Sequence, residues 1–192
     1  MHSDNQSVPP NCFFEVDDAE DEWTFSAKFD YVHGRALLTC FRDASQVIRS
    51  AYKSLAPGGW LELQDAYFPM FYVGGRDPES TALYKWNKLC MEGAAQFGRP
   101  WTYAQHYKRY LEEAGFESVT ERRFYWPLSP WAKGKYYRTV AEFFQEDMLS
   151  GVDGISFKVL GALGWHIDEI RVFLAQVRED MKDTSIHAYL NM

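Results

Sequence analysis

The chain has 192 residues, of which 46% are hydrophobic and 24% charged, a composition typical of one soluble globular domain. That composition excludes intrinsic disorder and a bilayer-spanning segment, and the polar N-terminus lacks the apolar core of a secretory signal. A net charge of −7 without a basic stripe argues against direct nucleic-acid binding. We therefore expect an intracellular protein, cytoplasmic or nuclear, with neither nucleic acid nor membrane among its partners.

The first half of the chain alternates between strand and helix patterns. After a flexible lead-in over residues 1–11, β-favouring runs at 12–16, 29–32 and 60–63 predict three strands. An amphipathic helix is predicted over 43–55, because its apolar residues recur with helical spacing until the Ala-Pro-Gly-Gly turn. Strand, helix, glycine turn and strand form a βαβ unit, which predicts a parallel α/β sheet.

The second half is mostly helical in pattern. Helices are predicted over 78–97, 102–114, 134–149, 154–163 and 167–181, and one strand over 116–125. Thr102 and Gln105 have the spacing of a capping box at the start of the second helix. His166, before the last helix, is interpreted as a weak cap rather than a ligand.

Composition adds two expectations. Aromatic residues make up 17% of the chain, including seven Trp, which indicates a large core or a pocket for an apolar partner. The three cysteines form no metal-binding spacing, so reduced thiols in the interior and no metal site are expected: Cys12, Cys40 and Cys90.

Four ordered motifs resemble those of class I S-adenosylmethionine-dependent methyltransferases. They are residues 14–19 (FEVDDA), 29–35 (FDYVHGR), 55–62 (LAPGGWLE) and 111–116 (LEEAGF). The closing segments at 163–165, 177–180 and 186–189 resemble the LaeA-like branch from filamentous fungi, whose members tailor secondary metabolites or regulate their production.

The resemblance begins at the lead-in to the family's third strand. The Gly-rich cofactor loop and the ribose-binding acid of the family have no counterpart, and the chain stops before the family's last strand. The resemblance therefore implies one truncated methyltransferase-like domain over 1–192: an incomplete Rossmann-like α/β sheet with a helical cap over about 126–182. Two interpretations stay open, a piece of a longer protein or a short form that rebuilds its sheet, for example by dimerising through an exposed edge.

The resemblance implies an S-adenosylmethionine site. Asp17, Asp18 and Ala19 match the family's adenine contacts, although a turn-capping Asp explains Asp18 equally simply. His33 and Arg35 follow a strand at the edge where α/β sheets place ligands, so His33 is a candidate general base and Arg35 a candidate anion contact.

The same edge supplies the remaining candidates. Asp65 follows the strand at 60–63 and is a third candidate for catalysis, although solvent-facing or structural roles are open alternatives. Aromatic residues match the region where the family closes its acceptor pocket, and they would suit a planar or polyketide-like small molecule: Tyr67, Trp101, Tyr103, Tyr125 and Trp126. A core role is the alternative for these rings.

Three functions remain compatible with the sequence. The first is a methyltransferase-family protein of fungal secondary metabolism, with autonomous methyl transfer doubtful without the cofactor loop. The second is a cyclase, isomerase or pericyclase-type enzyme that uses the acceptor pocket without the cofactor. The third is a non-catalytic protein-binding partner.

Overall fold

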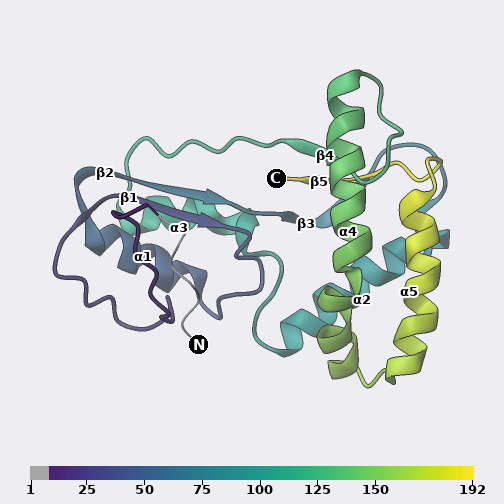
Figure 1. Cartoon of the computed structure of the whole chain (residues 1–192), viewed down its shortest axis with the longest axis horizontal. Helices are drawn as coiled ribbons and strands as arrows, with labels where there is room; N and C mark the ends of the chain where they lie inside the picture. The colour runs from purple at the N-terminus through teal and green to yellow at the C-terminus, as the bar shows by residue number, and fades with distance from the viewer. Residues whose placement is uncertain (1–8) are drawn as a thin grey trace.

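The computed structural model describes residues 9–192, arranged as two lobes (Figure 1). The first eight residues of the predicted lead-in lie outside the described part. The first lobe contains strand β1 (Phe29–Arg35), helix α1 (Ala44–Ser54), strand β2 (Leu55–Gln64) and helix α3 (Tyr107–Ala114). β1 and β2 are parallel, with Tyr31 opposite Trp60 and Arg35 opposite Gln64. The predicted βαβ unit is confirmed.

Helix α1 has the N-terminal cap and apolar face that its sequence predicts. The Asp43 carboxylate accepts hydrogen bonds from the backbone N–H groups of Ser45 (2.9 Å) and Gln46 (3.2 Å). Ala44, Ile48 and Ala51 are buried at helical spacing against the sheet. Capping and burial together fix where this helix begins and which side faces β1 and β2.

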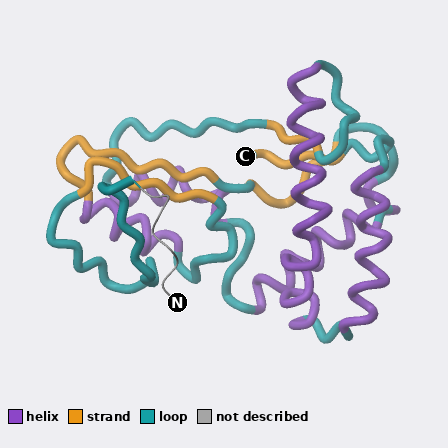
Figure 2. The backbone as a smooth tube through the Cα atoms, viewed as in Figure 1, coloured by secondary structure: helices purple, strands orange, loops and turns teal. Residues whose placement is uncertain are grey.

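The second lobe holds a second sheet and the long helices (Figure 2). Its antiparallel strands run in the order β3 (Tyr67–Tyr72), β5 (Ala188–Asn191) and β4 (Tyr125–Pro127). The C-terminal segment thus forms the central strand of this sheet. The sequence analysis assigned no strand to residues 188–191, because four residues carry little periodicity and the pairing partners are distant in sequence.

Three helices pack behind this second sheet: α2 (Ala82–Gln96), α4 (Lys135–Ala162) and α5 (Ile167–Lys182). Short 3-10 turns precede α2 (Pro78–Ser80) and α3 (Tyr103–His106). Trp86 is fully buried and donates its indole N–H to the Ser156 hydroxyl at 2.8 Å. The large buried cluster lies in this lobe and draws its members from β3 onward, between Phe68 and Leu190. Within residues 9–192, no helix is long and apolar enough to cross a membrane.

Several local predictions are wrong. Residues 12–16 form no strand, and Phe13, Phe14 and Val16 are exposed, because no described strand lies beside them to complete a ladder. Most of 116–125 is irregular for the same reason, and only its last residue enters β4. The two helices predicted at 134–149 and 154–163 form one helix, since its buried face continues through the glycines between them.

The caps and thiols also differ in part from expectation. The predicted capping box is wrong, because Thr102 makes no side-chain capping bond to the 3-10 turn that follows it. The His166 cap is confirmed, with Glu169 completing a capping box. All three cysteines are free, but only Cys90 is buried; the prediction of interior thiols is wrong for Cys12 and Cys40, which lie in exposed loops.

Candidate functional site

A cavity of ≈ 660 Å³ lies in the first lobe, bounded by the sheet and helix α1. Its apolar wall comes from α1 and from the sheet residues that face it, and Tyr107 of α3 contributes another part. Two groups of predicted residues line the same cavity from different segments of the chain: Asp17, Asp18 and Ala19 before β1, and His33 and Arg35 on β1. The structure therefore brings together five of the predicted site residues.

The segment with Asp18 is fastened to the start of α1. The Glu20 carboxylate accepts backbone hydrogen bonds from Arg42 (2.6 Å) and Asp43 (3.0 Å), and pairs with Arg99 at 3.8 Å. One Asp18 oxygen accepts the Glu20 N–H at 2.9 Å, as expected for a turn-capping Asp. Asp18 thus has a structural role with one oxygen, while its other oxygen has no hydrogen-bond partner among residues 9–192.

Three aromatic residues that were not predicted also line this cavity: Trp23, Phe41 and Tyr107. Trp23 donates its indole N–H to the Ala19 carbonyl at 3.0 Å, which holds the turn of residues 17–19 in place. Tyr107 approaches from α3. Trp23 could have been predicted from the sequence only by its position four residues after Ala19. No sequence signal indicates that Tyr107 lines the cavity, because its position depends on how α3 packs.

His33 lies on the exposed face of β1. Its imidazole stacks on the Tyr31 ring, with the ring centroids 6.1 Å apart and the planes 8° apart. The Tyr31 hydroxyl donates to the Glu62 carboxylate, and this bond raises the pKa of Tyr31 and lowers the pKa of Glu62. His33 therefore belongs to a surface row of aromatic and polar side chains as well as to the cavity rim.

Asp65 lies apart from His33 and Arg35. Its side chain is 9% exposed; one oxygen accepts the Tyr107 hydroxyl at 2.9 Å and the other the Ala66 N–H at 2.9 Å. Burial raises the pKa of Asp65, opposed by these hydrogen bonds and by backbone N–H groups of the loop after β1. Burial and the Asp65 carboxylate hold the pKa of Tyr107 well above its ordinary value.

The aromatic residues predicted for the acceptor site do not line this cavity. They lie in the second lobe and in the segments that connect the two lobes. Tyr67 and Tyr125 both pair with Asn191, from opposite sides of β5. Trp126 packs on Phe144 with the ring centroids 5.5 Å apart.

The other two predicted rings have structural partners. Trp101 is 2% exposed and packs on Phe68 at 4.7 Å between centroids, so its surroundings are those of a core residue. The Tyr103 hydroxyl donates to the backbone carbonyl of Arg42.

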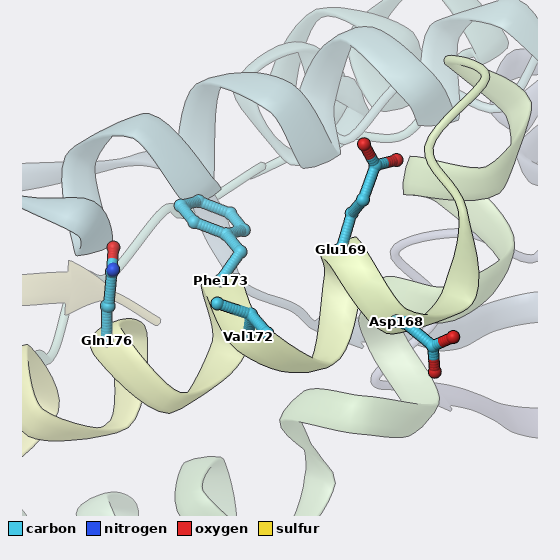
Figure 3. Close-up of a pocket in the computed structure, with 5 residues that line it drawn as sticks. All are labelled: Asp168, Glu169, Val172, Phe173 and Gln176. Carbon is cyan, nitrogen blue, oxygen red and sulfur yellow. The ribbon is translucent and has the colours of Figure 1, made fainter.

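A second hollow of ≈ 470 Å³ lies along α5, and it contains none of the predicted residues (Figure 3). Its two acids already have partners: Glu169 caps the helix by accepting the His166 N–H at 2.7 Å, and Asp168 pairs with Arg171 at 3.4 Å. The cavity of the first lobe is therefore the candidate functional site.

Sequence comparisons bear on the family of the chain. The family described as "Methyltransferase domain" matches residues 3–121, which include the first lobe and its cavity. The chain is 30% identical to the probable methyltransferase tdiE of Emericella nidulans over 91% of this chain and 55% of that protein. It is 29% identical to methyltransferase pytC of Aspergillus terreus over 94% and 56% of the two chains.

A third relative represents the branch whose motifs close the sequence. The secondary metabolism regulator laeA of Monascus pilosus is 26% identical, over 94% of this chain and 50% of that protein. The chain spans about half the length of these curated relatives. The resemblance inferred from the motifs is thus confirmed, and the chain belongs to the methyltransferase-domain family, among the relatives of the fungal LaeA-like branch.

Proposed function

We propose that this chain takes part in S-adenosylmethionine-dependent methylation of a small molecule in fungal secondary metabolism. The observation that carries the proposal is that Asp17, Asp18 and Ala19 lie on the same ≈ 660 Å³ cavity as His33 and Arg35. The names of the relatives support both the reaction class and the biological setting.

The described residues fit the nucleoside end of the cofactor. The Asp18 oxygen that makes no hydrogen bond can accept from the exocyclic amino group of adenine, beside the Ala19 backbone and the Trp23 ring. Apolar side chains of α1 and β2 form the opposite wall, which suits the faces of a purine. When bound, S-adenosylmethionine supplies an electrophilic methyl group on its sulfonium.

His33 and Arg35 would act at the end of β1. The Arg35 guanidinium is placed to bind a carboxylate or another anionic group, and the His33 imidazole to accept a proton from the acceptor. Asp65 has a different role in this proposal: its carboxylate is buried and fully hydrogen-bonded, so it positions Tyr107 in the cavity wall.

A planar aromatic or polyketide-like acceptor would be recognised by the aromatic side chains that follow β2. Tyr67 comes two residues after Asp65, and the Arg123 guanidinium lies over its ring at 4.5 Å. Tyr125 is 52% exposed on the other side of β5. The deeply buried Trp101 would support this region from the core rather than contact the acceptor.

Calorimetric titration of the chain with S-adenosylmethionine and S-adenosylhomocysteine tests the nucleoside site. Asp18→Asn should weaken binding about tenfold or more, because a charge-assisted hydrogen bond contributes about 1.5–3 kcal/mol. Asp21→Asn is the matched control. It removes the same charge only three residues from Asp18, but the Asp21 side chain does not line the cavity. It should change the dissociation constant by less than about twofold.

The result that would refute the proposal is equally specific. A chain with native circular dichroism that binds neither compound cannot use this cavity for the cofactor. That outcome would favour the two alternatives, a cofactor-independent enzyme of methyltransferase fold or a non-catalytic partner.

A further inference from the structure

Arg99 lies in the segment between α2 and α3, which links the two lobes (Figure 1). Gly98, with a φ of 68°, follows the end of α2, and the Arg99 N–H donates to the Ala94 carbonyl at 3.2 Å. This hydrogen bond belongs to a Schellman motif, which fixes the Arg99 backbone at the end of the helix. Two residues further on, Trp101 is buried against Phe68 in the second lobe. The second lobe therefore holds the backbone from which the Arg99 side chain extends.

The Arg99 guanidinium contacts two segments that border the cavity of the first lobe. Its Nη1 donates to the backbone carbonyls of Thr39, at 3.3 Å, and of Cys40, in the loop that follows β1. Its Nη2 lies 3.8 Å from the Glu20 carboxylate. Within residues 9–192, no other basic side chain comes within 4.0 Å of that carboxylate. One planar group thus joins the loop after β1 to the segment before it.

Glu20 carries this contact to the turn that contains Asp18. The Glu20 carboxylate accepts the N–H groups of Arg42 and Asp43 at the start of α1, at 2.6 and 3.0 Å. The Glu20 backbone N–H donates to the Asp18 carboxylate at 2.9 Å. The guanidinium, the carboxylate and these N–H groups therefore connect the turn before β1, the loop after it and the start of α1.

We propose that Arg99 is a positioning residue of the candidate site, which holds the turn of residues 17–19 against the loop after β1. The proposal rests on the proposed function, because it takes the cavity to be a ligand site. Arg99 does not line the cavity, so it acts through Glu20 and the loop carbonyls rather than by touching the ligand. A guanidinium suits this role, because its rigid fork of donors can bind acceptors on two segments at once. The side chains of Arg99 and Glu20 are 31% and 18% exposed, so water screens this pair less than it screens a surface pair.

Arg99→Gln and Arg178→Gln, compared in the 192-residue chain, test the proposal. The first change removes the guanidinium that faces Glu20 and keeps a polar side chain. The second is the matched control, because the Arg178 side chain is 30% exposed and pairs with Asp153 at 2.8 Å between the long helices. Each variant loses one partly exposed ion pair, and neither arginine lines the cavity. An effect found only for Arg99→Gln is therefore not a general loss of stability.

Amide exchange followed by NMR, without any ligand, measures the positioning itself. The N–H groups of Arg42 and Asp43 should exchange about threefold to tenfold faster in Arg99→Gln than in the unchanged chain. Their rates in Arg178→Gln should stay within about twofold of the unchanged values. Arg99→Lys keeps a positive charge beside Glu20 and should exchange more slowly than Arg99→Gln. Equal rates in Arg99→Gln and the unchanged chain would overturn the proposal.

Calorimetric titration with S-adenosylhomocysteine measures the consequence for the ligand. Arg99→Gln should weaken binding about threefold to tenfold, and Arg178→Gln less than about twofold. If the unchanged chain binds and Arg99→Gln binds equally well, Arg99 does not position the site. If the unchanged chain does not bind, the proposed function fails, and the exchange rates of the two amides still decide whether Arg99 holds the border of the cavity.

Discussion

The hydrogen bond between Tyr107 and Asp65 leads to the most specific prediction, the effect of Tyr107→Phe. The change removes one donor, 2.9 Å away, from a carboxylate that is 9% exposed, and leaves the ring in place. A hydrogen bond to a buried charged group contributes about 1.5–3 kcal/mol to the free energy of unfolding. The unfolding equilibrium near neutral pH should therefore rise about tenfold to a hundredfold.

The loss should depend on pH, in a direction set by Asp65. Its folded-state pKa is raised above the unfolded value, because burial penalises the carboxylate. The cost of burying this charge is thus present at neutral pH and is relieved as pH falls through the raised folded pKa. Without the Tyr107 donor that pKa rises further. Once Asp65 is protonated, the lost bond is one between neutral groups, contributing about 0.5–1.5 kcal/mol.

Urea unfolding followed by circular dichroism at about pH 7 and about pH 4 measures both values. Tyr110→Phe, on the same helix, removes a hydroxyl that makes no hydrogen bond within residues 9–192, and it should cost less than about 0.5 kcal/mol. An equal loss for Tyr107→Phe at both pH values would show that the carboxylate charge is not what this hydroxyl stabilises.

Three further changes test the helical lobe and the thiols. Gly93→Ala should destabilise the protein by about 2–5 kcal/mol, because the added Cβ would lie 2.2 Å from the Val159 carbonyl oxygen, where α2 crosses α4. Thermal unfolding measures this loss, and a midpoint near that of the unchanged protein would contradict the close contact. Gly154→Ala, in open space within α4, should instead stabilise by about 0.5–1 kcal/mol in the same assay. Burial raises the pKa of the Cys90 thiol to about 12, so a thiol reagent at mildly alkaline pH should modify two sites rapidly and the third only on unfolding. A single fast equivalent would contradict the exposure of the two remaining cysteines, Cys12 and Cys40.

Local patterns predicted the first lobe well, because its order is encoded within a few residues. Asp43 and the apolar spacing of Ala44, Ile48 and Ala51 are sufficient to predict α1. The Ala-Pro-Gly-Gly turn predicted after it is wrong, because these residues belong to β2, which begins at Leu55 directly after the helix. Asp17, Asp18 and Ala19, which line the cavity, were likewise singled out from a motif, FEVDDA, whose members are adjacent in sequence.

Features that depend on distant pairing escaped prediction. Residues 12–16 have the composition of a strand, but no described strand lies beside them, so they form no β-ladder. β5 is the reverse case: four residues become a strand because β3 and β4 lie on either side of them. In α4, Gly151 and Gly154 suggest a break, yet the burial of Val152 and Ser156 against α2 keeps the helix continuous.

The candidate site was predictable only in part: five of its residues were predicted, but Trp23 and Tyr107 were not, and neither was the grouping of the predicted residues. The motifs identify Asp18, His33 and Asp65, and nothing in their spacing tells which of them share a space. The fold places the first two on one cavity and holds Asp65 behind Tyr107, a residue 42 positions further along the chain. The separation of the aromatic residues from this cavity also depends on how the second sheet forms.

The uneven distribution of buried side chains has a consequence for the chain in the cell. The large buried cluster belongs to the second lobe, whereas β1 has no fully buried residue and the cavity occupies part of the first lobe's interior. The first lobe should therefore open locally at a lower free energy than the second. A ligand at a hundredfold excess over its dissociation constant would add about 2.7 kcal/mol to the stability of the state that binds it. The lifetime of this chain against proteolysis would then follow the supply of that ligand.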